Sequence, residues 1–313
     1  MNTSTDTTTT STATSTTTST TAATATPTGS LGGRFTFPGT TRTVHRMGYG
    51  AMQLAGPNVW GPPRDPAAAA AVLREAIALG IDHIDTADTY GPHVVNDLLR
   101  STLHPYPHHV VVVSKLGGRR GDGGTWIPAT SARELREDLE ENLRRLGLDA
   151  LEIVNLRLMS MTPTEGPFDD ELRALIELQR AGLVKHIGLS NVTARQVAHA
   201  QTLTPIVCVQ NHYNLAHRSD DALIDRLAEQ GIAYVPFFPL GGFSPLQSST
   251  LSTVAADVGA SAMQVALAWL LQRSPNILLI PGTSSVVHLH DNVAAASLVL
   301  PPAAIAALDG IAG

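Results

Sequence analysis

Residues 110–156 read VVVVSKLGGRRGDGGTWIPATSARELREDLEENLRRLGLDALEIVNL and alternate between two kinds of pattern. The apolar runs at 110–114 and 152–156 are short and rich in branched side chains, as in strands buried on both faces. Between them, Ser131-Ala132-Arg133-Glu134 is a capping box that opens a segment of helical period. The stretch therefore predicts a strand, a helix and a second strand parallel to the first.

The same alternation extends along most of the chain. Further short apolar runs predict strands at 47–51, 81–84, 186–189, 206–209, 233–236 and 277–280. Helices are expected to begin near Asp65, His93, Ser131, Asp169, Thr193, Ser219, Thr250, Ser261 and Val286. Eight βα repeats in about 270 residues favour a single closed (β/α)8 TIM barrel of class α/β. The alternative is an open doubly wound sheet, but the sequence has no G-x-G-x-x-G motif for it.

Two segments precede the first predicted repeat. Residues 1–32 are rich in Ser and Thr and poor in large apolar side chains, so we expect a disordered tail. An organellar transit peptide shares this composition, but it needs basic residues and this stretch has none. The segments 34–37 and 41–45 flank Pro38-Gly39-Thr40 and predict a β-hairpin that closes one end of the barrel. The barrel domain is expected to span 33–313.

Charge and cysteine content narrow the class of protein. The chain has 21 Lys and Arg against 27 Asp and Glu, so nucleic acid and anionic membranes are not expected partners. The single cysteine, Cys208, lies in an apolar run and is expected to be buried, which is typical of a reducing compartment. The 12 histidines show no metal-ligand spacing, and no apolar run has the length of a membrane span. We expect a soluble cytoplasmic protein, either a monomer or a small homo-oligomer, without a metal.

Polar and aromatic residues follow almost every predicted strand. In a TIM barrel the carboxyl ends of the strands meet on one face, where active sites lie. Asp85, Tyr90 and Lys115 follow two neighbouring strands and can therefore converge. An ammonium beside a phenol stabilises the phenolate that remains after proton donation, and a carboxylate keeps the ammonium oriented. A buried ion pair beneath a packed tyrosine is an equally good interpretation of these three residues alone.

Five ordered motifs together resemble the aldo-keto reductase superfamily. They are GIDHIDTADTYG (80–91), VSK (113–115), KHIGLSN (185–191), VQN (209–211) and IPGTS (280–284). Within that superfamily, the pyridoxal-reducing members are most similar to the stretches 48–57, 60–63, 154–157 and 235–242. The resemblance covers essentially the whole chain after the Ser- and Thr-rich segment.

The resemblance implies a hairpin followed by a (β/α)8 barrel, and an enzyme in which NADPH delivers a hydride to a carbonyl carbon. It assigns Tyr90 as the acid that protonates the carbonyl oxygen, with Asp85 and Lys115 as its partners. The fourth catalytic residue of the family, usually histidine, is replaced here by Arg157. A guanidinium can polarise a carbonyl oxygen, but it does not readily release a proton.

The function that the resemblance implies is the reduction of a small aldehyde, pyridoxal to pyridoxine. One alternative is a reductase of a different aldehyde or ketone of specialised metabolism. Another is an NADPH-binding regulatory protein without catalysis, which only the replacement at Arg157 suggests. Retention of Asp85, Tyr90 and Lys115 argues against this loss.

The resemblance also implies an NADPH site. The residues expected to contact the cofactor are Gly50, Met52, Ser190, Asn191, Gln210, Phe237, Phe238, Pro239, Leu240, Gly241, Gly282, Thr283, Ser284, His288, Asp291 and Asn292. Among them, Ser190, Asn191 and Gln210 match the residues that hold the nicotinamide carboxamide, and Phe237 matches the aromatic ring that stacks on the nicotinamide. Many members carry Lys or Arg where this chain has Gly282 and His288, so NADH stays the alternative cofactor.

Four residues are expected at the mouth of the substrate site. Trp60 lies in a Pro- and Gly-rich loop and offers an aromatic wall, and His93 follows Tyr90 closely enough to meet a ring hydroxyl. Arg119 and Arg120, in the Gly-rich loop after the third strand, can recognise an anionic substituent. The alternative for both arginines is an ordinary solvated charge on a loop.

Overall fold

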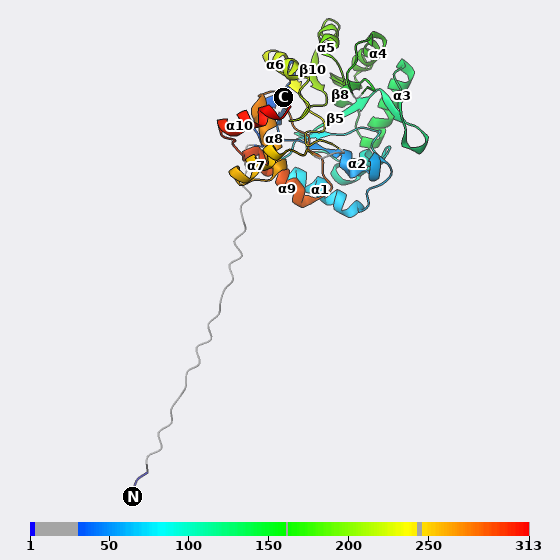
Figure 1. Cartoon of the computed structure of the whole chain (residues 1–313). Helices are drawn as coiled ribbons and strands as arrows, with labels where there is room; N and C mark the ends of the chain where they lie inside the picture. Colours follow the sequence, from blue (N-terminus) through cyan, green and yellow to red (C-terminus); the bar gives the residue numbers. More distant parts are fainter. Residues whose placement is uncertain (4–30, 161, 243–245, 313) are drawn as a thin grey trace.

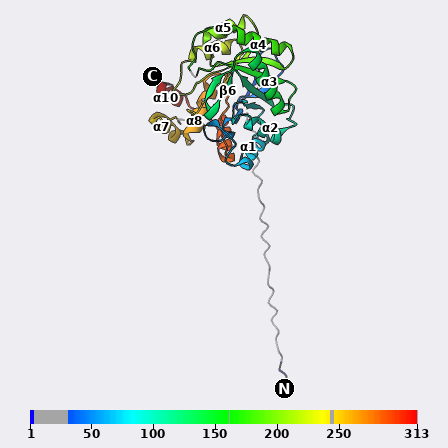
Figure 2. The same ribbon diagram turned by 90° about the vertical axis from the view of Figure 1, so that its right-hand side faces the viewer.

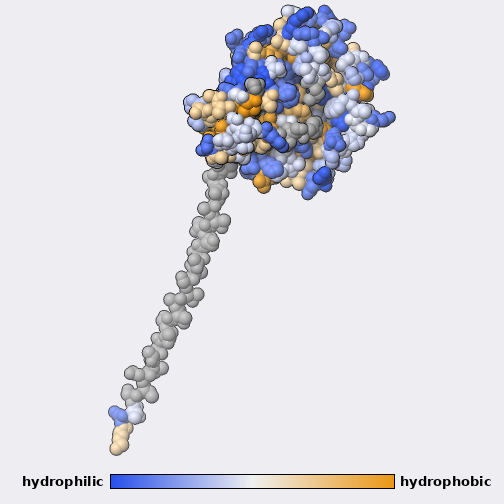
Figure 3. Space-filling model, in the orientation of Figure 1, coloured by the Kyte–Doolittle hydropathy of each residue, from blue (hydrophilic) through white to orange (hydrophobic). Residues whose placement is uncertain are grey.

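The computed structural model describes residues 1–3, 31–160, 162–242 and 246–312. In two perpendicular views, helices form the outer layer around a curled parallel sheet (Figures 1 and 2). On the face drawn in Figure 3, hydrophilic residues cover much of the surface and apolar residues form scattered patches. Across these described parts, no single helix has the length and apolar character to cross a membrane. The bent pairs α7 (Ser249–Val258) with α8 (Ala262–Arg273) and α9 (Val286–Ala294) with α10 (Pro302–Asp309) reach that threshold only when combined.

The parallel sheet confirms the predicted barrel. Its strands, in spatial order, are β3 (Tyr49–Gly50), β4 (His83–Asp85), β5 (Val111–Leu116), β8 (Leu151–Arg157), β9 (Val184–Ser190), β10 (Ile206–Gln210) and β11 (Ala233–Tyr234). The eighth predicted strand, 277–280, closes the ring through single bridges rather than a full ladder. One bridge joins Ile277 to Tyr234, and another joins Leu279 to Met47.

Most helices begin where the sequence predicts. The remaining helices are α1 (Pro66–Ala78), α2 (Val94–Leu103), α3 (Ala132–Leu146), α4 (Asp169–Arg180), α5 (Ala194–Gln201) and α6 (Asp221–Glu229). Capping boxes at Ser131, Thr193 and Ser261 each satisfy otherwise unpaired backbone N–H groups at a helix start. The sequence analysis missed α10, a short Ala-rich helix without a side-chain N-cap.

The predicted N-terminal hairpin is present. It consists of β1 (Arg34–Thr36) and β2 (Thr43–His45), paired antiparallel. His45 N donates to Asp82 Oδ1 at 2.7 Å, which fixes the hairpin at the amino ends of the strands because Asp82 directly precedes β4. The folded part begins before the predicted boundary at residue 33, since Leu31 is buried and its carbonyl accepts from Met47 N. The rest of the predicted tail, 4–30, lies outside the described residues.

A second hairpin forms at the opposite end of the barrel, in the segment that the sequence analysis treated as a loop. It comprises β6 (Gly118–Arg120) and β7 (Trp126–Pro128), in which Arg120 lies opposite Trp126. The two strands have only three residues each and, apart from the buried Gly118, are exposed or half-buried. Such short strands carry little periodic signal, so the pattern of apolar residues did not reveal them.

Two apolar layers hold the barrel together. The interior layer contains branched side chains of the strands together with Phe37 and Val44 of the N-terminal hairpin. The outer layer lies between the strands and the helices and is larger. Cys208 is buried in the interior layer, as predicted, and it is a free thiol. These layers leave the carboxyl ends of the strands to be filled by polar residues.

Candidate active site

Alternation along the strands points one set of side chains into the barrel. Val113 of β5 belongs to the interior layer, and Lys115 is the next residue on the same face. On β8, Ile153 starts the same inward row, which continues at Asn155 and ends at Arg157. The period of two therefore brings Lys115 and Arg157 to the carboxyl end of the barrel interior.

Lys115 is the centre of a buried polar cluster. Its Nζ donates to Asp85 Oδ1 at 2.5 Å, to the Thr86 carbonyl at 3.0 Å and to the Tyr90 hydroxyl oxygen at 3.1 Å. Only 7% of Lys115 is exposed. Burial acts to lower the pKa of Lys115, but the charges and hydrogen bonds of Asp85 and Tyr90 outweigh it and raise the pKa. The ammonium is therefore held charged against the phenol, as the sequence predicts.

A hydrogen-bonded network behind the strands fixes this cluster. Thr86 Oγ1 donates to Asn96 Oδ1 at 2.8 Å, and Asn96 Nδ2 donates to Asn142 Oδ1 at 3.1 Å. Ser114 Oγ donates to the same Asn142 oxygen at 2.6 Å. The sequence analysis placed Thr86 and Ser114 at strand ends without a role, and it missed Asn96 and Asn142. A signal was present, because Asn142 lies in the buried stripe of α3, where an apolar side chain is expected.

Arg157 lies beside the Tyr90 cluster with only 8% of its surface exposed. Its Cζ is 5.1 Å from the ring centroid of Trp126, which comes from the second hairpin. Burial lowers the pKa of Arg157, whereas the nearby Tyr90 and Asp85 act to raise it. Within the described residues, Arg157 Nε and Nη2 are buried without a hydrogen-bond acceptor.

Gln210 and Asn191 lie next to the cluster. Gln210 Nε2 donates to Asp85 Oδ2 at 2.9 Å across the barrel, and Asn191 Nδ2 donates to the Leu158 carbonyl at 2.8 Å. In the described part of the chain, Gln210 Oε1 and Asn191 Oδ1 are buried acceptors without a donor. Ser190, at the end of β9, is buried beside Asn191. Of the predicted carboxamide-binding residues, Gln210 contacts Asp85, and Asn191 N donates to the Gln210 carbonyl at 3.1 Å. Their role stays a prediction.

The segment after β11 carries the predicted aromatic residue. The ring of Phe237 is half-buried and stacks on His212, with centroids 5.5 Å apart. Phe238 adopts a left-handed φ of 54°, and its carbonyl accepts from Asn214 Nδ2. The neighbouring Pro239 is buried, and Leu240 and Gly241 are half-buried. Burial and the nearby His217 lower the pKa of His212 to about 4.

The predicted adenosine-phosphate segment lies beside the first strand. A Cβ on Gly282 would come within 2.6 Å of the Gly50 carbonyl, so this approach needs glycine. The Tyr49 hydroxyl donates to the Thr283 carbonyl at 2.6 Å and fixes the turn before α9. The other residues predicted for the cofactor site differ in exposure. Met52 is half-buried, Asn292 is buried, and Ser284, His288 and Asp291 are exposed.

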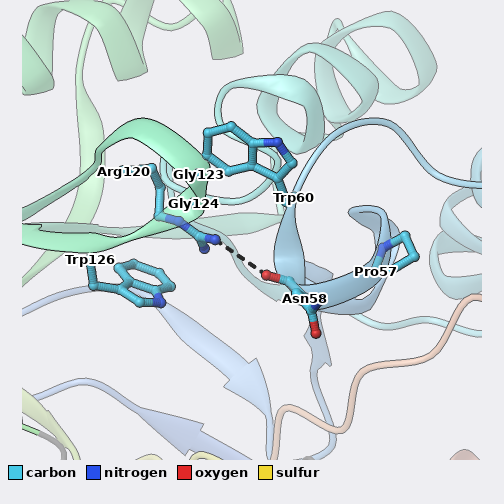
Figure 4. A pocket seen from close by; sticks show the side chains of 7 residues that line it. All are labelled: Pro57, Asn58, Trp60, Arg120, Gly123, Gly124 and Trp126. Carbon is cyan, nitrogen blue, oxygen red and sulfur yellow. Dashed lines mark hydrogen bonds between the residues drawn. The ribbon is translucent and has the colours of Figure 1, made fainter.

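The predicted mouth residues have different surroundings. Trp60 and Arg120 line a cavity of about 410 Å³ together with Asn58 and Trp126 (Figure 4). The other lining residues are Pro57, Gly123 and Gly124. Arg119, by contrast, pairs with two carboxylates of α3, Asp138 at 2.7 Å and Glu137 at 2.9 Å.

His93 lies between the Tyr90 loop and α2. Its Nδ1 is 2.9 Å from Asp88 Oδ1, and that hydrogen bond is the largest of the effects that raise the pKa of His93. The structure thus groups Trp60 and Arg120 in one cavity, whereas Arg119 and His93 already have acidic partners. The substrate contacts expected of all four residues stay predictions.

Comparisons with known proteins point to one family. The model of the Aldo/keto reductase family matches residues 46–312. Pyridoxine 4-dehydrogenase of Escherichia coli K12 is 62% identical over 279 residues, which cover 88% of this chain and 98% of that protein. An uncharacterized oxidoreductase of Schizosaccharomyces pombe is 37% identical over 267 residues, covering 85% of this chain and 86% of the relative.

Solved structures share the fold. A thermostable aldo-keto reductase in complex with the inhibitor epalrestat has a TM-score of 0.76 at 27% identity, covering 89% of this chain and 99% of that chain. An aldo/keto reductase from Klebsiella pneumoniae, in complex with NADP and acetate, has a TM-score of 0.68 at 24% identity, with coverage of 85% and 91%. With the barrel and the buried cluster around Lys115, these matches establish that the chain belongs to the aldo/keto reductase family.

Proposed function

We propose that this protein uses NADPH to reduce a small aldehyde to its alcohol, with pyridoxal as the substrate and pyridoxine as the product. The observation that carries the proposal is the buried series Asp85–Lys115–Tyr90, joined at 2.5 Å and 3.1 Å. The identity of 62% to a protein named pyridoxine 4-dehydrogenase supports the choice of substrate, since reduction of pyridoxal is the reverse of that oxidation.

The residues present fit a nicotinamide cofactor. Gln210 Oε1 and Asn191 Oδ1 are buried acceptors without a donor among the described residues. Gln210 contacts Asp85, and Asn191 N donates to the Gln210 carbonyl. A carboxamide N–H is a suitable donor for either oxygen, and leaving such acceptors unpaired is costly. Bound NADPH would supply the hydride to the carbonyl carbon. NADPH is preferred to NADH because Thr283, Ser284 and the N-terminus of α9 offer donors to a further phosphate.

Tyr90 is the proposed proton donor. Its hydroxyl proton moves to the carbonyl oxygen as that oxygen gains negative charge, and a phenolate remains on Tyr90. Lys115 Nζ already donates to the phenolic oxygen and stabilises this phenolate by charge. Asp85 holds the ammonium in place through its short contact, and Gln210 in turn fixes the second Asp85 oxygen.

Arg157 is the proposed electrophilic helper. It lies close enough to Tyr90 and Asp85 for their charges to oppose the lowering of its pKa by burial. A guanidinium does not readily release its proton. It therefore polarises the carbonyl and orients it toward the Tyr90 hydroxyl, but it does not transfer a proton. The activity thus needs no histidine at this position.

The test is the replacement Tyr90→Phe, with NADPH oxidation followed by absorbance. We expect kcat with pyridoxal to fall by about 100-fold or more, because general acid catalysis contributes roughly that factor. Binding of NADPH, measured by fluorescence, should change little. Unchanged turnover in Tyr90→Phe would refute the mechanism.

Wild-type protein separates the remaining alternatives. Turnover of another aldehyde but not of pyridoxal would correct only the substrate, and faster turnover with NADH would correct the cofactor. Tight NADPH binding without turnover of any aldehyde would favour a regulatory protein.

A cytoplasmic location and a monomeric or small homo-oligomeric state complete the proposal, and the buried free thiol of Cys208 is compatible with a reducing compartment.

A further inference from the structure

Two arginines share one indole at the mouth of the site. Arg120 Cζ lies 4.3 Å from the ring centroid of Trp126 and 5.3 Å from that of Trp60. Arg157 Cζ lies 5.1 Å from the same Trp126 ring. Figure 4 shows the side chain of Arg120 between the two indoles, with its hydrogen bond to the Asn58 carbonyl. These contacts connect the exposed Trp60 and Trp126, through Arg120, to the buried Arg157, which lies beside the Tyr90 cluster.

Arg120 and Arg157 differ from Arg119 in their charged neighbours. Across the described residues, no carboxylate lies within ion-pair distance of Arg120 or Arg157, although the preceding Arg119 has two, Asp138 and Glu137. Arg120 Nε and Nη1 and Arg157 Nε and Nη2 are buried without an acceptor in this part of the chain. Buried donors normally have partners, and buried charges are normally paired.

The face of an indole ring stabilises a cation through the quadrupole of the ring. It does not accept hydrogen bonds from the N–H groups, which lie in the plane of the guanidinium. Two like charges over one ring also repel, and Arg120 is among the charges that lower the pKa of Arg157. An anionic oxygen bound between them would reduce this repulsion and supply the missing acceptor. The 410 Å³ cavity beside Arg120 provides room for a planar ligand next to the indoles.

We propose that Arg120 and Arg157, held over Trp126, form an anion subsite that selects aromatic aldehydes carrying a negatively charged oxygen. Pyridoxal meets this description, because its aldehyde is adjacent to a ring oxygen that is ionised at neutral pH. 2-Carboxybenzaldehyde, whose carboxylate is also adjacent to the aldehyde, meets it as well. The inference rests on the proposed function and assigns Arg120 as its specificity-determining residue.

The kinetic test compares two aldehydes that differ in charge, 2-carboxybenzaldehyde and its methyl ester. Arg120→Met keeps an unbranched apolar side chain and removes the charge. We expect it to raise KM for the carboxylate about tenfold or more, as for a lost charge-assisted hydrogen bond, and to change KM for the ester less than about twofold. Arg120→Lys should recover part of the preference for the carboxylate. Arg133→Met removes an exposed charge on α3 and is the matched control, for which both KM values should be unchanged.

A binding measurement keeps the inference separate from the proposed function. Quenching of tryptophan fluorescence reports ligands at Trp60 and Trp126 without any turnover. Benzoate should bind wild-type protein more tightly than benzamide, and Arg120→Met should remove this difference. Wild-type protein that reduces neither pyridoxal nor these two aldehydes would refute the proposed function, whereas equal effects of Arg120→Met on charged and neutral ligands would overturn the anion subsite. Circular dichroism of each variant establishes that it is folded.

Discussion

Replacing Asp85 by asparagine tests the electrostatics of the site most directly. Asn has the shape of Asp but no charge, so Asp85→Asn leaves the ammonium of Lys115 buried, with the Thr86 carbonyl and the Tyr90 hydroxyl as its other acceptors. Removing one partner of a buried ion pair costs about 3–5 kcal/mol of unfolding free energy. The loss of unfolding free energy in Asp85→Asn has an upper limit, because Lys115 can release its proton instead of staying charged without a partner. Moving a lysine pKa from 10.5 to 7 costs about 5 kcal/mol at 1.36 kcal/mol per unit.

The pH dependence distinguishes a charge effect from a packing effect. In wild-type protein the pKa of Lys115 is raised, so its stabilisation is fully present below about 10.5 and is lost as pH rises through the folded value. In Asp85→Asn the sign is reversed, because the buried ammonium without its counter-ion has a lowered pKa. Its penalty is therefore largest near neutral pH and shrinks as pH rises toward 10.5.

The assay is urea unfolding followed by far-UV circular dichroism, with linear extrapolation to water. Asp85→Asn should lose about 3–5 kcal/mol at pH 7 and clearly less at pH 9.5. The double variant Asp85→Asn with Lys115→Met removes both charges and should be closer in stability to wild type than either single variant, while remaining inactive. A loss below about 1 kcal/mol at pH 7, or one that does not change with pH, would refute the reasoning.

Two further changes probe the barrel interior and its rim. A Cβ on Gly188 would lie 2.0 Å from Asn155 Oδ1 and 2.5 Å from Cys208 Sγ, so Gly188→Ala should destabilise the fold by about 1–3 kcal/mol in urea unfolding. A loss below about 0.5 kcal/mol would mean that the interior relaxes freely there. The folded-state pKa of His212 is lowered to about 4, so the unfolded state binds its proton more readily and stability falls as pH decreases from about 6.5 toward 4. His212→Phe should weaken the loss of stability between pH 7 and pH 5, and an unchanged pH profile would show that His212 does not contribute.

The local patterns that the sequence predicts well are the ones that depend on few neighbours. Capping residues such as Ser131 need only the next turn of their own helix, and the structure places helix starts accordingly. The strands at 110–114 and 152–156 also form close to their predicted bounds, as β5 and β8. Short elements were missed where tertiary contacts, rather than periodicity, stabilise them, as in the hairpin from Gly118 to Pro128.

The residues of the candidate site also fall into those that the sequence predicted and those that it did not. Asp85, Tyr90 and Lys115 were predicted because they follow consecutive strands, and adjacent parallel strands bring such residues together. The contact between Gln210 and Asp85 joins strands on opposite sides of the barrel, so it depends on closure of the sheet. Asn142 was missed because a polar residue in an apolar stripe is explained only by its buried partners.

The sequence by itself determined the βα repeat, the barrel class, the family resemblance and the residues at the ends of the strands. These properties follow from local periodicity and from motifs that are read along the chain. Only the tertiary structure decided that Trp126 lies over Arg157 and that Arg120, unlike Arg119, has no carboxylate partner among the described residues. The orientation of the second hairpin sets these contacts, and that orientation depends on packing between segments far apart in sequence. Charge on a loop is therefore visible in the sequence, whereas what neutralises it is a property of the fold.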